Sequence, residues 1–127
     1  MIFDTDILIW FMKRHPASAK LVDSVPLAER RLSAVTFLEL LYGCNNTASL
    51  SEVQRLVSDL FAEVIPLTEP ITESALQIMS RFVLSRRPGA NDVLIAATAL
   101  HRQEQLATAN RKHFDFIPGL ELKVFRP

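Results

Sequence analysis

Residues 1–10 of the chain read MIFDTDILIW, and this stretch decides the fold. Ile2 and Phe3 form a short apolar run that stops at Asp4, which is typical of a brief buried strand. The apolar run that follows has the length and composition of a short helix ending before Pro16. A strand that passes directly into a helix begins an α/β fold, and Asp4 and Asp6 stand at the junction.

The same alternation continues to the end of the chain. Further strands are predicted around Leu32 to Val35 and over 63–67, 106–109 and 120–125, the last being the weakest pattern. Between them the sequence predicts helices over 17–25, over 37–43, from Ser49 or Ser51 to Phe61, from Thr68 to about residue 84, and over 91–103. Short strands without polar alternation, separated by helices, indicate a parallel sheet with helices on both faces.

Composition sets limits on the kind of protein this is. A chain of 127 residues, 49% apolar and 22% charged, is globular and long enough to bury roughly two-thirds of its unfolded surface as a single domain, 1–127. Lys plus Arg equals Asp plus Glu at 14 each, so any nucleic-acid binding requires a local patch of cations. Only three glycines are present, and no phosphate-binding glycine loop occurs.

Cellular location follows from features that the sequence lacks. Cys44 is the only cysteine, so no internal disulfide can form, which favours a reducing cytoplasm. The first residues contain no basic region leading into an apolar stretch, and no apolar run approaches the ~20 residues of a membrane-spanning helix. We therefore expect a cytoplasmic protein with no membrane association.

Three acids stand among apolar residues near the predicted carboxyl ends of the strands. Asp4 ends the first strand, Glu39 lies in TFLELLYG after the second, and Asp92 opens the very apolar segment NDVLIAATAL. Singly, each has an ordinary explanation, because Asp4 and Asp92 could cap helices and Glu39 could be solvated. At one edge of one sheet, however, they would repel each other unless they took up protons or bound a cation.

The chemistry of these ligands indicates the kind of ion. Carboxylate oxygens favour Mg²⁺ or Mn²⁺ over softer metals. A hard divalent ion in a chain with no candidate thiol nucleophile suggests attack of water on a phosphodiester.

Four segments in order, IFDTDILIW, SAVTFLELLYG, NDVLIAATAL and LATANRKHFDFIPGLEL, resemble the successive motifs of PIN-domain ribonucleases, and more narrowly of VapC toxins. The resemblance covers essentially the whole chain. It implies a three-layer α/β/α sandwich with a short, mostly parallel sheet of four or five strands. It further implies a homodimeric, Mg²⁺- or Mn²⁺-dependent endoribonuclease with a cognate antitoxin, in higher assemblies with that antitoxin.

Carried over by position, the resemblance assigns the family's first three acids to Asp4, Glu39 and Asp92. Asp4 and Asp92 are expected to hold the ion and Glu39 to orient or deprotonate the attacking water. Three further residues are expected to support the site without binding the ion: Thr5, Asp6 and Asn110.

The fourth acid of the family pattern is missing. Its position, three residues after Asn110, is occupied by His113, and Asp115 lies two residues further on. His113 is either a surface residue beside Phe114 or a nitrogen ligand, which suits Mn²⁺ better than Mg²⁺. We therefore expect the metal preference to shift toward Mn²⁺.

Other residues are candidates for contacts with partners. An RNA strand entering an acidic site needs cations around it, and four are available near the motifs: Arg86, Arg87, Arg111 and Lys112. Trp10 and Phe11, in the early apolar helix, belong either to the core or to the groove that receives the antitoxin.

Two other functions remain open from the sequence. FDTDIL is also similar to the opening of haloacid-dehalogenase-type phosphatases, with Asp4 as nucleophile and Asp6 as general acid, although that reading leaves Glu39 unexplained. The other alternative is a non-catalytic PIN-like binding module that lost its chemistry with the fourth acid.

Overall fold

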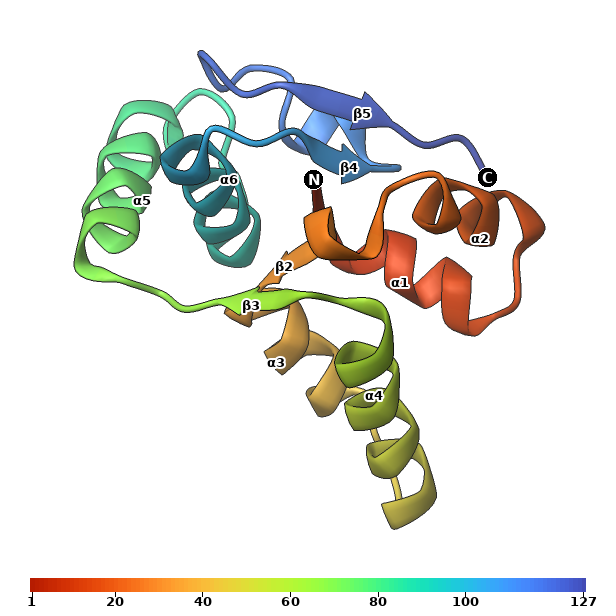
Figure 1. Cartoon of the computed structure of the whole chain (residues 1–127). Coiled ribbons are helices and arrows are strands. Elements are labelled where there is room, and N and C mark those ends of the chain that lie inside the picture. The colour runs from red at the N-terminus through yellow and green to blue at the C-terminus, as the bar shows by residue number, and fades with distance from the viewer.

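The computed structural model describes residues 1–127 as a five-stranded sheet with helices on both faces (Figure 1). The strands are β1 (Ile2–Phe3), β2 (Arg31–Ser33), β3 (Glu63–Ile65), β4 (Leu106–Thr108) and β5 (Leu122–Val124). The helices are α1 (Thr5–Met12), α2 (Pro16–Asp23), α3 (Ala34–Tyr42), α4 (Thr47–Leu60), α5 (Glu69–Phe82) and α6 (Ala90–Arg102), with short 3₁₀ turns η1 (Leu27–Glu29) and η2 (Arg111–His113).

All neighbouring strands pair in parallel, in the order β3-β2-β1-β4-β5. Strand β1 is therefore central, with Ile2 opposite Arg31 on one side and opposite Leu106 on the other. The predicted α/β architecture with a parallel sheet is confirmed, and the weak fifth strand is present. Because the strands run in one direction, the residues that follow β1, β2 and β4 share one edge of the sheet.

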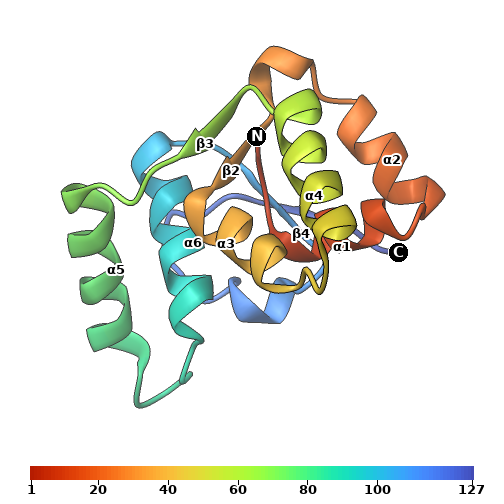
Figure 2. The same ribbon diagram turned by 90° about the horizontal axis from the view of Figure 1, so that it is seen from below.

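Helices α5 and α6 cover one face of the sheet, whereas α1, α2 and α4 cover the other, as both views show (Figures 1 and 2). Adjacent strand residues point to opposite faces. Ile2 packs with α5 and α6, and Phe3 packs with α1, α2 and α4. The two faces therefore bury separate hydrophobic clusters.

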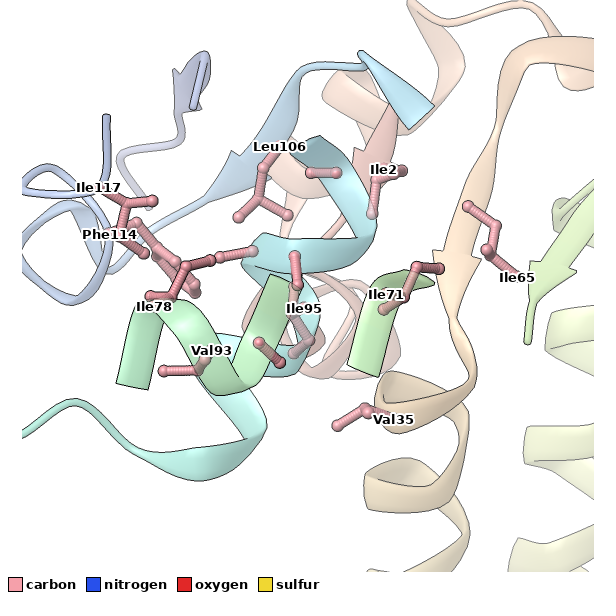
Figure 3. Close-up of a cluster of buried hydrophobic side chains, with 14 residues drawn as sticks. Ile2, Val35, Ile65, Ile71, Ile78, Val93, Ile95, Leu106, Phe114 and Ile117 are labelled. Atoms are coloured by element: carbon pink, nitrogen blue, oxygen red, sulfur yellow. The ribbon is translucent and has the colours of Figure 1, made fainter. Parts of the chain in front are cut away.

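The cluster under α5 and α6 is drawn in Figure 3. Ile71 and Ile78 of α5 and Ile95 of α6 meet Leu106 of the sheet, and all four are buried. Phe114, fully buried, joins this cluster from the segment after η2. This packing fixes the chain between β4 and β5, including the neighbouring His113.

The opposite edge of the sheet, at the amino ends of the strands, carries paired charges. Arg31 reaches Glu63 over 3.2 Å and Glu104 over 2.9 Å, and Arg102 also pairs with Glu63. Every charge in this network has a partner of opposite sign. Where the strands end there is no such network, only the separate contacts of His113 with Asp92 and of Arg111 with Asp115 described below.

Several predicted boundaries were wrong by a few residues, and two of these errors have a clear local cause. The second strand stops at Ser33, not Val35, because the Ser33 hydroxyl accepts a hydrogen bond from the Val35 N–H and starts α3 at Ala34. Helix α4 is capped by Asn46 and not by Ser49 or Ser51. Asn46 Oδ1 accepts from the Ser49 N–H over 2.8 Å, and the Ser49 hydroxyl accepts from the Asn46 N–H, which makes a reciprocal capping box.

None of the six helices combines the length and the apolar character that crossing a bilayer would require.

The cap of α4 can be tested by substitution. We expect Asn46→Ala to lower the free energy of unfolding by about 1 kcal/mol, because it leaves the Ser49 N–H without its acceptor. Ser51→Ala, inside the same helix, is the matched control and should change stability little. Urea unfolding followed by circular dichroism measures both, and a larger loss in Ser51→Ala would restore the cap to that residue.

Candidate active site

The site is built where β1, β2 and β4 end at the same edge of the sheet. Asp4 follows β1 directly, Thr108 is the last residue of β4, and α3 begins as soon as β2 ends. Since β1 lies between β2 and β4, its acid is flanked on both sides. The structure places the three expected acids, Asp4, Glu39 and Asp92, at this edge of the sheet, with Asp6 beside Asp4.

Asp4 is the most buried acid of the group, with only 4% of its surface exposed. Its Oδ1 accepts a hydrogen bond from the Thr5 N–H over 2.8 Å, and its Oδ2 accepts one from the Thr108 hydroxyl over 2.8 Å. It therefore does cap α1, as its ordinary explanation required. The cap also fixes the carboxylate between two strands, in an orientation that an exposed side chain would not keep.

Glu39 is connected to the same centre through Thr5. The Thr5 hydroxyl donates a hydrogen bond to Glu39 Oε1 over 2.7 Å and shares a 3.1 Å hydrogen bond with the Thr36 hydroxyl. Thr5 and Thr36 are both buried. The carboxyl group of Glu39 is therefore held by Thr5 of α1, whose hydroxyl is in turn hydrogen-bonded to Thr36 of α3. The place of Glu39 on α3 follows from the helix start at Ala34, three residues before the start at Phe37 that the sequence predicted.

Asp6 ties the first helix to the loop after β4. Its Oδ2 accepts hydrogen bonds from the Ala109 N–H over 2.8 Å and from the Asn110 side chain over 2.9 Å. Asn110 in turn donates its backbone N–H to the Thr108 hydroxyl. The second oxygen, Asp6 Oδ1, is buried and has no hydrogen-bond partner.

Asp92 and His113 face each other across the outer part of the site. His113 Nδ1 lies 3.2 Å from Asp92 Oδ2, although the His113 side chain is 56% exposed. Asp92 stands in the first turn of α6, where the positive end of the helix dipole favours a carboxylate. His113 is therefore a member of the same cluster of side chains and also a surface residue.

Burial and mutual repulsion raise the pKa values of these acids. Burial, followed by the charge of Asp6 and more weakly that of Asp92, raises the pKa of Asp4 to about 7, against the opposing hydrogen bonds from Thr108 and Thr5. Burial also raises the pKa of Asp6, although the Ala109 N–H opposes it. Burial raises the pKa of Asp92 as well, with the charges of Glu39 and Asp6 adding to it and His113 opposing it. The acids therefore share one electrostatic environment.

This environment fits a hard divalent cation. No three His, Cys, Asp or Glu side chains converge closely enough to enclose an ion without further ligands. Mg²⁺, however, is commonly held by one or two carboxylates and retains several waters, so it needs no closed protein cage. Asp4 and Asp92 offer carboxylate oxygens, and the unpartnered Asp6 Oδ1 indicates that the buried negative charge is not fully compensated by the protein.

Cations border the site on two sides. A hollow of about 430 Å³ is lined by Asp92 and His113 together with Arg86, Arg87 and Lys112. A second hollow, of about 450 Å³, adjoins it and is lined by Arg111, Lys112, His113 and Arg126. The four cations expected from the sequence therefore all lie beside His113.

Asp115 lies apart from these contacts. It is exposed, and its carboxylate makes a 3.9 Å ion pair with Arg111, one helical turn earlier. Of the two residues considered for the missing fourth acid, His113 is the one that touches Asp92.

Sequence reasoning missed Thr108 and Thr36. Thr108 ends β4, so the rule that pointed to acids at strand ends would have found it had hydroxyl groups been included. Thr36 has no comparable signal, because its role depends on the register of α3 against α1.

The raised pKa values make stability depend on pH in a defined direction. The Asp4 carboxyl titrates near 3.8 in the unfolded chain and near 7 in the fold, so between these values the folded protein holds a proton that the unfolded chain has released. Stability of the metal-free protein should therefore fall as the pH rises from about 4 through 7. Thermal unfolding in EDTA at pH 5 and pH 8 measures this, and Asp4→Asn should reduce the difference. An unchanged difference in Asp4→Asn, with exposed Asp23→Asn as the control, would contradict it.

Comparisons with known proteins identify the family of this chain. Residues 1–119 match the family model of the PIN domain. Ribonuclease VapC10 of Mycobacterium tuberculosis (strain ATCC 25618 / H37Rv) is 36% identical over 126 residues, covering 95% of this chain and 90% of that protein. The tRNA(fMet)-specific endonuclease VapC of Shigella flexneri is 27% identical over 124 residues, covering 94% of this chain and 92% of that protein.

Solved structures show the same fold. VapBC-1 from nontypeable Haemophilus influenzae matches with a TM-score of 0.78 and 28% identity over 98% of both chains. VapBC2 from Rickettsia felis, bound to a DNA fragment from their promoter, matches with a TM-score of 0.82 over 99% of this chain and 100% of that chain; at 23% identity this likeness concerns the fold alone. A family model over nearly the whole length and a relative at 36% identity show that this chain belongs to the PIN-domain family, among the VapC ribonucleases.

Proposed function

We propose that this chain is the toxin of a toxin–antitoxin pair and cleaves RNA as a Mg²⁺- or Mn²⁺-dependent endoribonuclease. The observation that carries the proposal is a group of carboxylates at one sheet edge, one buried and the others half-buried, with the pKa of Asp4 raised to about 7 and cations beside it. Ionised carboxylates this close together destabilise the metal-free protein, and a bound cation would offset their repulsion. The names of the VapC relatives, a ribonuclease and an endonuclease, support the same activity.

In this mechanism Asp4 and Asp92 hold the ion. When bound, the ion supplies positive charge to the phosphate oxygens and lowers the pKa of a water molecule. Glu39, held by Thr5, accepts the proton of the attacking water. The water oxygen bonds to phosphorus as the bond to the ribose 3′ oxygen breaks, and the released 3′ oxygen takes a proton from solvent water, which leaves a 5′-phosphate and a 3′-hydroxyl.

The other polar residues keep this arrangement in place. Thr108 orients the Asp4 carboxylate, and Asp6 fixes the loop that carries Asn110. Each of these two bonds joins residues that are 104 positions apart in the sequence, linking the end of β1 and the start of α1 to the end of β4 and the loop after it. In this proposal Thr5, Asp6 and Asn110 support the site through these hydrogen bonds without binding the ion.

The RNA approaches over the cations. Arg86, Arg87 and Lys112 line the hollow next to Asp92, and Arg111 lines the neighbouring one. Contacts of this kind bind phosphates and orient a strand without reading its sequence. They also offset the repulsion between a polyanion and an acidic site.

The antitoxin is proposed to bind between α1 and α4. A hollow of about 460 Å³ there is lined by Phe11, Leu56 and Leu60, with Arg55 and Asp59 among its other residues. Trp10 is half-buried and packs edge-on against His15, so it supports this helix from the side. Several solved relatives are toxin–antitoxin complexes, which supports a partner of this class.

A homodimer is proposed through the exposed apolar residues of α3 and the segment before α5. Leu38 is 61% exposed, Tyr42 91% and Leu67 39%, and all three line a single hollow of about 640 Å³. A contiguous apolar surface of this kind marks an interface in proteins of this size. Glu39 lines the same hollow, so the interface would adjoin the active site.

Neither alternative from the sequence is favoured by these contacts. A phosphatase would use Asp4 and Asp6 and has no role for Glu39, which the Thr5 hydroxyl holds at the same sheet edge. A non-catalytic module would have no need to keep Asp4, Glu39 and Asp92 in one electrostatic environment.

Cleavage of labelled cellular RNAs, including tRNA and ribosomal RNA, tests the activity directly. We expect discrete cuts by the purified, antitoxin-free protein with Mg²⁺ or Mn²⁺ and none with EDTA. Asp92→Asn should reduce the rate by at least about 100-fold, because it removes a charge that holds the ion. Absence of cutting by folded, dimeric protein with either ion would reject the nuclease and favour the binding module.

His113 provides a separate test of metal preference. Because an imidazole nitrogen suits Mn²⁺ better than Mg²⁺, the wild type should be activated more strongly by Mn²⁺, and His113→Asp should move the preference toward Mg²⁺. Initial rates across a titration of each ion measure the ratio. An identical ratio in the wild type, in His113→Asp and in the exposed control Lys123→Ala would remove His113 from the ion's surroundings.

A further inference from the structure

The hollow beside Asp92 contains an aromatic surface that phosphate binding does not explain. Its lining includes Phe116 as well as Arg86, Arg87, Lys112, Asp92 and His113. The Arg86 guanidinium lies over the Phe116 ring, 5.4 Å from its centroid, within the range of a cation–π contact. Phe116 is only partly buried, and Arg86 is exposed.

This pair rests on a rigid support. The Phe82 ring stands edge-on to Phe116 with centroids 5.0 Å apart, and both rings pack against the core cluster under α5 and α6. Phe116 therefore cannot turn away easily, and it holds the Arg86 guanidinium at the wall of the hollow. The next residue, Arg87, has a positive φ of 45° immediately before Pro88, a conformation rarely adopted by residues with a side chain. The backbone is therefore constrained at Arg87, beside the place where the two arginines line the hollow.

Planar guanidinium and aromatic groups are what proteins use to stack unpaired nucleobases. A lysine would serve for a phosphate alone, whereas arginine adds a flat face that can stack on a ring. The volume of about 430 Å³ lies within the usual range of ~300–1,000 Å³ for small-ligand sites. Asp92 and His113 form another wall of the same hollow, so its occupant would lie next to the reacting phosphate.

We propose that this hollow is a nucleobase subsite, in which one unpaired base of the RNA, beside the scissile phosphate, stacks on the Arg86 guanidinium that Phe116 supports. The inference rests on the proposed ribonuclease function and adds a specificity-determining role to it. It requires that the base be turned out of a helix, so the substrate is single-stranded at the cut.

An abasic scan tests the subsite. From a short single-stranded RNA that the wild type cuts, a series is prepared in which each nucleotide near the cut is replaced in turn by an abasic one. At one position within two nucleotides of the cut, the abasic replacement should lower kcat/KM roughly 5- to 150-fold, as expected for a lost stacking contact of ~1–3 kcal/mol. Loss of the base at other positions should have much smaller effects.

Variants then connect that position to the hollow. Arg86→Lys keeps the positive charge but loses the planar group, so it should cut the parent RNA more slowly and no longer respond to the abasic nucleotide. Phe116→Leu should behave in the same direction, whereas Phe116→Tyr should retain the response. Arg81→Lys is the matched control, because the Arg81 guanidinium lies over Phe82 at 5.0 Å but does not line the hollow. Circular dichroism melts verify that each variant is folded.

The outcomes separate this inference from the proposed function. If the wild type cuts no RNA, the ribonuclease proposal itself fails. If it cuts all abasic RNAs as it cuts the parent, or if Arg86→Lys and Phe116→Leu keep the full response, the subsite is rejected while the nuclease stands. A loss of antitoxin affinity in Arg86→Lys without any change in the abasic response would also reject it, and would assign the hollow to a protein side chain.

Discussion

The site depends on one costly arrangement, the carboxylate of Asp4 buried at the end of the central strand. Its two oxygens are held by the Thr5 N–H and the Thr108 hydroxyl, so the residues before and after it have little freedom. Thr5 then holds Glu39, and Thr108 also accepts from the Asn110 N–H. One buried acid thus links α1, α3 and the loop after β4. Because β1 lies in the middle of the sheet, no other strand end could connect both sides.

The second constraint is the packing behind the outer part of the site. Phe114 is fully buried and anchors the segment that carries His113. Helix α6, which carries Asp92, packs in the same hydrophobic cluster. The contact between His113 and Asp92 therefore joins two elements that the core already holds together. Phe116 and Arg86 lie on the edge of this packing, where aromatic support and exposed charge meet. The same hydrophobic cluster therefore supports both the residues proposed for catalysis and those proposed to bind the RNA strand.

Much of this could be predicted from the sequence because the signals are local. The run that ends at Asp4 and the apolar helix after Asp92 each depend on neighbouring residues. The errors arose where the hydrogen bond of a polar side chain decides at which residue a helix begins, as at Ser33 and Asn46. Thr36 and Phe116 could not be found because their roles depend on contacts between distant segments. Neither residue lies in a pattern that differs from an ordinary helix or loop.

The two edges of the sheet differ in how their charges are balanced. Where the strands begin, Arg31 and Arg102 neutralise Glu63 and Glu104, so the charged groups are satisfied by the fold itself. Where the strands end, the acids outnumber the cations that contact them. Their burial and mutual repulsion lower the free energy of unfolding of the metal-free protein. Activity and stability are therefore opposed at these positions. In evolution, a substitution that abolishes the chemistry by removing the half-buried Asp92 carboxylate would tend to leave a more stable fold, so inactive descendants of this chain should persist as well-folded proteins.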